Sequence, residues 1–143
     1  MTPAADSSGS IAETAVDQAE FRRRLSGFGV PGPLIDDAWE IVAGPALGVL
    51  LYGSYARRAA SAHSDLDLLV LSDVRTHSAE SERVSVAHYT SAQLREAHQT
   101  LYGMHLVRDG VIIHDSAGVL AEILATFSPP TRISSWHAFA SSA

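Results

Sequence analysis

The apolar residues in the first third of this chain follow helical spacing that glycine and proline interrupt. Good helix formers run over 12–25 and stop at Gly27 and Gly29, which predicts a first helix. Apolar residues then recur at helical spacing between the Pro31-Gly32-Pro33 break and Gly44-Pro45. This second pattern predicts a helix over about 33–43.

Continuous apolar runs replace the helical spacing in the middle of the chain. The runs 46–52 and 66–71 are bounded by glycine, proline or polar residues and are short enough to be buried strands. Residues 83–89 alternate well enough to predict a third strand. Between the first two strands, 54–60 is expected to form a short helix.

The remaining pattern predicts a helix, a hairpin and a last helix. Thr90-Ser91-Ala92-Gln93 has the form of a capping box, which opens a helix through about Leu101. The segments 104–107 and 111–114 flank Asp109-Gly110, a pair that fits a type I′ turn, and are predicted to form a β-hairpin. The final helix is expected over 116–127, before Pro129-Pro130.

A chain of 143 residues is expected to form one domain with a real core. We expect a flexible N-terminus over 1–10, a folded domain over 11–128 that includes the N-terminal helices, and a C-terminal tail over 129–143. Trp136 lies in that Ser-rich tail and could mark a contact with a partner or with a second copy of the chain in a homo-oligomer.

Composition narrows the classes of protein that this chain can represent. With 46% hydrophobic and 18% charged residues it suits a folded domain. A formal charge of -6 disfavours binding to nucleic acid through phosphates. The absence of cysteine excludes disulfides, thiolate metal sites and a cysteine nucleophile. No apolar run is long enough to span a membrane and the N-terminus lacks the order of a signal peptide, so a cytoplasmic location is expected.

One segment carries a pattern that points to specific chemistry. The pair Gly53 and Ser54 is followed by ten residues and then by Asp65 and Asp67 within an apolar run. Glycine lets the backbone approach a phosphate closely, and the serine adds a hydroxyl beside exposed amides. The two aspartates offer carboxylates to a divalent cation. Arg57, three residues after the serine, could meet a phosphate as a charged donor.

Each half of this pattern also has a plain structural interpretation. A Gly-Ser pair can be a strand-to-helix turn with Ser54 as its N-cap, and Asp-x-Asp can be the polar start of a strand. Arg57 could equally lie on a solvated face. Tyr52 and Tyr55 could stack on a base, although Tyr52 ends an apolar strand and suits core packing better. The joint occurrence of both halves favours a site that grips a nucleoside triphosphate through its phosphates and its metal.

The Gly53-Ser54 pair and Asp65-Leu66-Asp67 resemble the motif of the minimal nucleotidyltransferases of the DNA polymerase beta-like superfamily, especially the antitoxin-type proteins paired with HEPN ribonuclease toxins. The resemblance is strongest from roughly 47 to 71. It implies an α/β (α+β) fold with a short mixed sheet flanked by helices. It also implies Mg²⁺-dependent transfer of a nucleoside monophosphate, with Gly53 and Ser54 on the triphosphate and both aspartates on one or two metal ions.

The chain departs from that family on the next strand, where a third carboxylate is usual. Ser85 stands where this aspartate is expected, and a serine hydroxyl is a weak neutral ligand. Two residues could compensate. His88 could act as a base or nitrogen ligand, although alternation places it on the opposite face. Glu82 could reach the site if a bulge shifts the register of the strand.

Three functions follow as hypotheses. The first is a Mg²⁺-dependent enzyme that moves AMP, or another nucleoside monophosphate, from ATP to a hydroxyl, with a partner protein such as a HEPN toxin as acceptor. The second is a nucleotide-binding or partner-binding module of the same fold that has lost transfer, which the missing carboxylate favours. The third is a nucleotidyltransferase for a small cationic acceptor of the aminoglycoside kind, which the acidic charge would suit.

Overall fold

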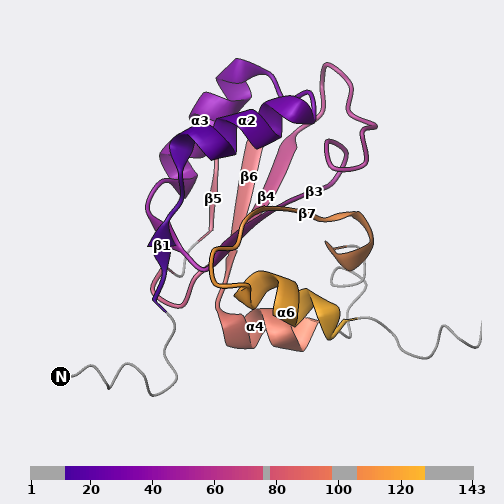
Figure 1. Ribbon diagram of the computed structural model, residues 1–143. Coiled ribbons are helices and arrows are strands. Elements are labelled where there is room, and N and C mark those ends of the chain that lie inside the picture. The colour runs from indigo at the N-terminus through magenta and orange to yellow at the C-terminus, as the bar shows by residue number, and fades with distance from the viewer. Residues whose placement is uncertain (1–11, 76–77, 98–105, 128–143) are drawn as a thin grey trace, which may run out of the picture.

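The computed structural model describes residues 12–75, 78–97 and 106–127. The predicted flexible N-terminus over 1–10, the tail over 129–143 with Trp136, and the end of the helix predicted through Leu101 lie outside the described residues. The elements, with the labels of Figure 1, are β1 (Thr14–Ala15), α2 (Gln18–Gly27), α3 (Gly32–Val42), β2 (Pro45–Ala46), β3 (Gly48–Tyr52), β4 (Leu66–Leu71), β5 (Ala79–Glu80), β6 (Val84–Tyr89), α4 (Ser91–Glu96), β7 (Val111–His114) and α6 (Val119–Ala125).

The centre of the fold is a five-stranded sheet with the order β5-β6-β4-β3-β7. Strands β4 and β6 are parallel, whereas the other neighbouring pairs are antiparallel. The expected short mixed sheet is therefore confirmed. The apolar run 66–71 corresponds residue for residue to β4, and 46–52 contains β3 together with Ala46, the second residue of β2.

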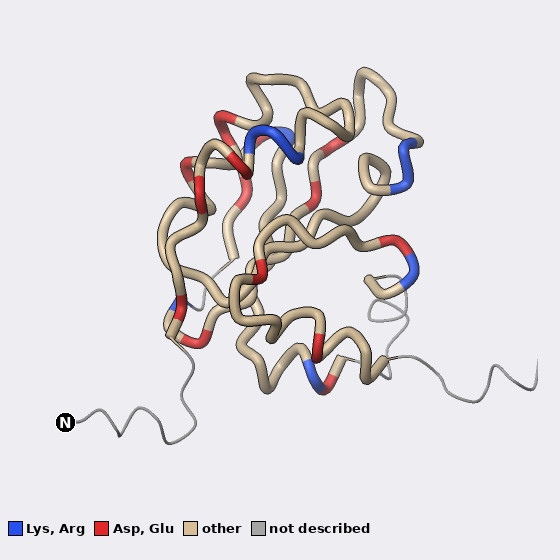
Figure 2. Tube along the Cα trace, viewed as in Figure 1, with Lys and Arg blue, Asp and Glu red and all other residues tan. Residues whose placement is uncertain are grey.

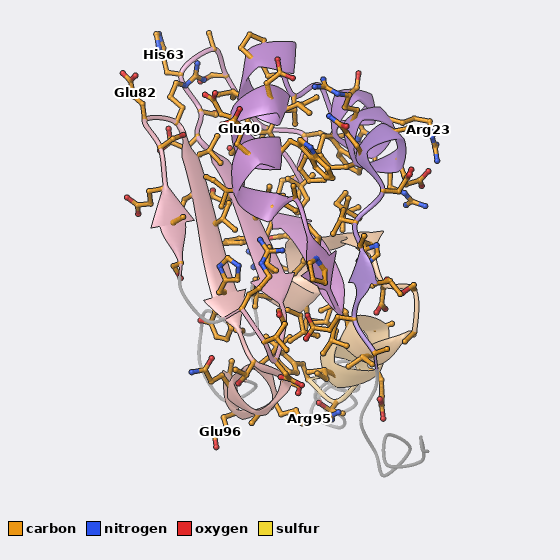
Figure 3. The ribbon with its side chains drawn as sticks, turned by 90° about the vertical axis from the view of Figure 1, so that its left-hand side faces the viewer. Arg23, Glu40, His63, Glu82, Arg95 and Glu96 are labelled. Atoms are coloured by element: carbon orange, nitrogen blue, oxygen red, sulfur yellow. The ribbon has the colours of Figure 1, made fainter. Side chains whose placement is uncertain are left out.

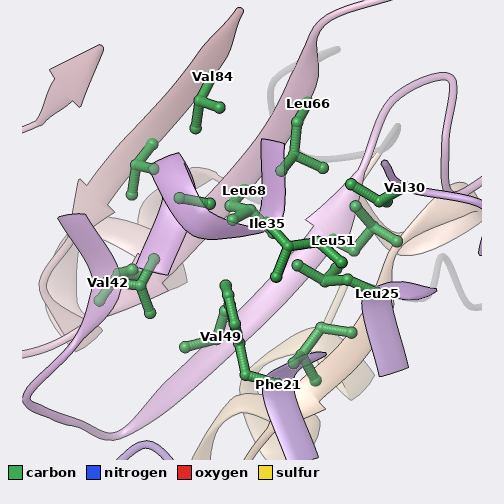
Figure 4. Close-up of a cluster of buried hydrophobic side chains, with 14 of the residues drawn as sticks. Phe21, Leu25, Val30, Ile35, Val42, Val49, Leu51, Leu66, Leu68 and Val84 are labelled. Atoms are coloured by element: carbon green, nitrogen blue, oxygen red, sulfur yellow. The ribbon is translucent and has the colours of Figure 1, made fainter. Parts of the chain in front are cut away.

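Helices cover both faces of this sheet (Figure 1). Helices α2 and α3 lie on one face, where their buried residues join the inward side chains of β3, β4 and β6 in one cluster (Figure 4). Helices α4 and α6 lie on the other face and contribute to a second cluster with Leu50, Leu69 and Leu71. Because both faces are covered, the central strands are continuous apolar runs rather than alternating ones.

The first predicted helix begins later than its composition indicates. Residues 14–15 form a short strand paired with β2, and the Val16 amide donates to the Gly44 carbonyl at 3.0 Å. The Asp17 carboxylate then caps α2 by accepting from the Glu20 amide at 2.9 Å. A tertiary pairing and a capping side chain thus set this boundary, which helix propensity alone does not locate.

Two further predictions were wrong. The segment after β3 forms hydrogen-bonded turns over 54–58 instead of a short helix, since a few residues cannot repay helix nucleation without a packed face. The predicted hairpin is absent because 106–109 is helical, with the Gly110 amide donating to the Leu106 carbonyl at 2.8 Å. Strand β7 pairs with β3 instead.

The capping box at Thr90 is confirmed. The Thr90 hydroxyl accepts from the Gln93 amide at 3.1 Å, and the Gln93 side chain accepts from the Thr90 amide at 2.9 Å. In the parts of the chain that the structure describes, no helix has the length and apolar character needed to cross a bilayer.

Candidate active site

All five strands of the sheet have a terminus at the same end. Strands β3 and β5 end there, whereas β4, β6 and β7 begin there, because β4 and β6 are parallel and the other neighbouring pairs are antiparallel. Gly53 follows β3, Asp65 precedes β4 and Asp67 is its second residue. The topology therefore brings the two halves of the sequence motif to neighbouring strands.

Gly53 leaves no room for a side chain beside the Asp67 carboxylate. Tyr52 and Asp67 are paired across β3 and β4, and Gly53 continues the chain with φ of +79°. A Cβ atom at Gly53 would lie 2.5 Å from Oδ2 of Asp67. Only glycine satisfies both the left-handed backbone and the close approach of the carboxylate.

The turn after Gly53 is held by its own backbone. The Arg57 amide donates to the Gly53 carbonyl at 3.2 Å, and the Ala59 amide donates to the Ser54 carbonyl at 2.9 Å. This curvature places the half-buried Ser54 beside Gly53 and brings Arg57 back toward the same end of the sheet. Backbone turns of this kind can cradle an anion.

Arginine hydrogen bonds hold the loop that leads into Asp65. The Arg83 guanidinium donates through Nη2 to the Ala62 carbonyl at 2.9 Å and to the Ser64 carbonyl at 2.7 Å. Next along the chain, the Leu66 amide donates to the Arg83 carbonyl at 2.9 Å. The approach to the aspartates is thus tied to the start of β6, which gives the two carboxylates a defined position.

Burial and charge act together on Asp67. Partial burial raises the pKa of its carboxyl first of all, the negative charge of Asp65 raises it further, and the positive charge of Arg57 lowers it. Asp65 itself is exposed. Two carboxylates that repel each other gain from a bound cation, so this electrostatic arrangement suits a divalent metal.

Ser85, the residue expected to replace the third carboxylate, lies level with Asp67. The parallel register pairs Asp67 with Ser85, so both side chains lie on the same face of the sheet at the same level. His88 is paired with Val70 and lies on the opposite face, as alternation predicted. The register of β4 with β6 is unbroken over Val84–Tyr89, and Glu82 lies before it, between β5 and β6. Glu82 is exposed beyond the start of β6 (Figure 3).

The structure adds a residue that the sequence analysis assigned to a turn. Asp109 directly precedes Gly110 and β7, and its carboxylate lies 3.6 Å from Nη1 of Arg57. The basic loop after β3 and the charged segment before β7 lie on the same side of the molecule (Figure 2). The available signal was an acidic residue shortly before an apolar run, as Asp65 is before β4.

Arg58 and Tyr55, in the turn after β3, contact α2 and the core. Arg58 has φ of +59°, donates to the Gly27 carbonyl at 3.2 Å and lies over the Phe28 ring at 4.3 Å from its centroid. Tyr55 is 4% exposed and belongs to the first core cluster, so its ring packs in the core rather than offering a face for a base. Tyr52 packs at the edge of the second core cluster.

Metal binding here would depend on Asp65 and Asp67. Within residues 12–75, 78–97 and 106–127, no group of three or more acidic or histidine side chains could hold a metal ion. Mg²⁺ usually keeps water and takes one or two carboxylates together with substrate phosphates, so two aspartates fit an ion that arrives with a nucleotide. Such an ion would neutralise charge on the phosphates.

Comparison with known proteins yields one family. The model of the nucleotidyltransferase domain matches residues 36–107, a span that contains Gly53, Ser54, Asp65 and Asp67. Among solved structures, a chain of one described as "Crystal structure of the toxin-antitoxin with AMP-PNP" is similar, with 14% identity, a TM-score of 0.47, and coverage of 79% of this chain and 94% of that chain. No curated protein gives a significant match. Since the family model spans half of the sequence, this chain belongs to the nucleotidyltransferase domain family.

Proposed function

We propose that this protein binds a nucleoside triphosphate, most simply ATP, with Mg²⁺ and transfers its nucleoside monophosphate to a hydroxyl group. The observation that carries the proposal is the close approach of the Asp67 carboxylate to Gly53. A backbone suited to phosphate and a carboxylate suited to metal are thus neighbours, which supports the proposal. Membership in the nucleotidyltransferase family supports the reaction class.

Each residue has a defined part in the proposed reaction. Gly53 and Ser54 bind the phosphates, Arg57 donates to them, and Asp65 and Asp67 hold the cation that supplies charge neutralisation. The acceptor oxygen forms a bond to the α-phosphorus while the bond from that phosphorus to the bridging oxygen of the β-phosphate breaks. Pyrophosphate leaves with the electron pair. The hydroxyl proton passes to water, because Ser85 beside Asp67 offers no carboxylate.

The acceptor that we propose is a hydroxyl residue on a partner protein of the HEPN toxin type, in line with the resemblance of the Gly-Ser and Asp-x-Asp motif. The formal charge of -6 argues against a nucleic-acid acceptor. A small cationic acceptor of the aminoglycoside kind is the enzymatic alternative, because an acidic protein attracts it as well.

Incubation with ATP labelled on its α-phosphate tests transfer. With Mg²⁺ and a HEPN ribonuclease or an aminoglycoside as acceptor, label is expected to move to one acceptor and pyrophosphate to appear. The Asp67→Asn variant should lose at least about a hundredfold in rate, as expected when a metal ligand is removed. Asp37→Asn is the matched control, since it removes an equal charge from an exposed position on α3.

The second candidate function is a binding module without transfer, which Ser85 specifically favours. It predicts that Mg-ATP binds and that Asp67→Asn weakens this binding, whereas no acceptor receives label. Failure of the wild-type protein to bind Mg-ATP at all would contradict both the transferase and the nucleotide-binding module, and would leave only a partner-binding module.

A further inference from the structure

Asp109 lies near the turn that begins at Gly53, because it pairs with Arg57 of that turn. Strand β7 pairs antiparallel with β3 through Leu50 with Ile112 and Leu51 with Val111. Asp109 lies two residues before β7, at the end of the helical turn 106–109, and its carboxylate is 3.6 Å from Nη1 of Arg57. Asp67 approaches Gly53 from β4. The turn that begins at Gly53 therefore lies close to Asp67 and, through Arg57, to Asp109.

Asp109 is the sheltered member of its ion pairs. Its side chain is 12% exposed, whereas Arg57 is 45% exposed and Arg108 is 64% exposed. Arg108 donates to both carboxylate oxygens, at 3.2 and 3.1 Å. The Asp109 carboxylate, held by Arg108, is therefore a rigid point of attachment. The more exposed Arg57 loses much of its conformational freedom by pairing with it.

The pair between Arg57 and Asp109 is close without being a hydrogen bond. The distance of 3.6 Å between Nη1 of Arg57 and Oδ2 of Asp109 is longer than an ordinary hydrogen bond. The ion pair therefore does not use an N–H group of Arg57 as a hydrogen-bond donor. A guanidinium has five such groups in a planar fork that matches phosphate oxygens. Arg57 also belongs to the turn that begins at Gly53, since its amide donates to the Gly53 carbonyl.

We propose that Asp109 is a positioning residue that holds the Arg57 guanidinium on the phosphate side of the Gly53-Ser54 turn. The inference rests on the proposed function, because it assigns Arg57 to the triphosphate. The change in ligand affinity that it predicts on removal of Asp109 is opposite to the change expected from charge alone. Removing an acidic residue beside a polyanion site would tighten binding if its charge alone mattered, whereas removing a positioning residue weakens binding.

Isothermal titration with Mg-ATP and with inorganic tripolyphosphate tests the inference. Asp109→Asn and Arg57→Gln are each expected to weaken both ligands about tenfold, the effect of one charge-assisted hydrogen bond. The double variant should bind no more weakly than Arg57→Gln, because Asp109 acts through that side chain. Asp109→Glu keeps the charge and should recover part of the affinity. Asp37→Asn, at an exposed position on α3, is again the control and should leave affinity unchanged.

The outcomes separate this inference from the proposed function. If Mg-ATP binds but Asp109→Asn binds it as tightly as wild type, or more tightly, the inference is overturned and the function is not. Additive losses in the double variant overturn it equally, and so does a loss in Asp109→Asn that is absent for tripolyphosphate. If wild type binds neither ligand, the function fails and takes the inference with it.

Discussion

Gly53 bears two constraints that can be separated experimentally. Its φ is +79°, and a Cβ would lie 2.5 Å from Oδ2 of Asp67. Gly29 has a similar φ of +83° with nothing within 4 Å of a Cβ. A side chain at either glycine would therefore strain the backbone similarly, but only a side chain at Gly53 would also clash with Asp67.

The matched pair Gly53→Ala and Gly29→Ala should give different results in binding. Both are expected to lose about 1 kcal/mol of unfolding free energy, measured by denaturant titration, because alanine is strained in the left-handed region. Gly53→Ala alone should weaken Mg-ATP binding by more than about tenfold, since the methyl group displaces the Asp67 carboxylate. Equal nucleotide affinities in the two variants would refute the role of the close approach.

Ser85 provides a gain-of-function prediction. Because Ser85 is the registered neighbour of Asp67, Ser85→Asp should add a third carboxylate to the site. Mg²⁺ affinity, measured by isothermal titration, is expected to rise about tenfold, and any transfer rate should rise with it. Ser85→Asn has the same shape without the charge and serves as control. Mg²⁺ affinity in Ser85→Asp no higher than in Ser85→Asn would show that this position does not face the metal.

At the scale of elements, Arg75 joins α3 to the end of β4. Its Nη1 donates to the Val42 carbonyl at 2.9 Å and its Nη2 donates to the Ile41 carbonyl at 2.7 Å. Nη1 also lies 3.1 Å from the Pro45 carbonyl. These carbonyls lie at or just past the C-terminus of the helix, where intrahelical donors run out and a cation is favourable. One planar guanidinium therefore caps α3 and fixes the approach to β3.

Arg75→Ala is expected to lower the unfolding free energy by about 2 kcal/mol, as for hydrogen bonds that involve a charged group. Arg75→Lys should recover less than half of this loss, because an ammonium cannot span the carbonyls as the fork does. Arg23→Ala, at an exposed residue on α2, should change stability little. Full recovery by lysine in the denaturant titration would argue against the geometric role of Arg75.

At the scale of the whole molecule, the charge that Asp67 carries at the site lowers the unfolding free energy. Burial and the charge of Asp65 raise the pKa of Asp67 above its ordinary value of 3.8. The folded state therefore binds this proton more tightly than the unfolded state does. The contribution of Asp67 to the unfolding free energy is fully present below 3.8 and is lost as pH rises through the raised pKa.

It follows that Asp67→Asn should be more stable than wild type at neutral pH, where wild type holds a partly buried charge near Asp65. The advantage should shrink as pH falls toward 3.8, because the wild-type carboxyl is then neutral as well. Thermal unfolding of both proteins without metal, across this pH range, measures the difference. A variant less stable than wild type at neutral pH would contradict the electrostatic account, and added Mg²⁺ should stabilise wild type only.

Local signals explain why part of this structure was predictable. The run 66–71 became β4, the pattern over 33–43 became α3 to within one residue at each end, and the capping box opened α4. The segment 106–109 is different. Asp109-Gly110 suits a hairpin turn, but β3 offers β7 a partner strand, so 106–109 is left to form a helical turn packed near Leu50.

The sequence by itself determined the apolar strands, the Gly-Ser and Asp-x-Asp motif and the replacement of an expected carboxylate by Ser85, because spacing along the chain encodes each of them. The tertiary structure alone decided that Ser85 is level with Asp67, that His88 and Glu82 are kept away, and that Asp109 meets Arg57. These depend on strand order and register, which arise from contacts between residues far apart in the chain.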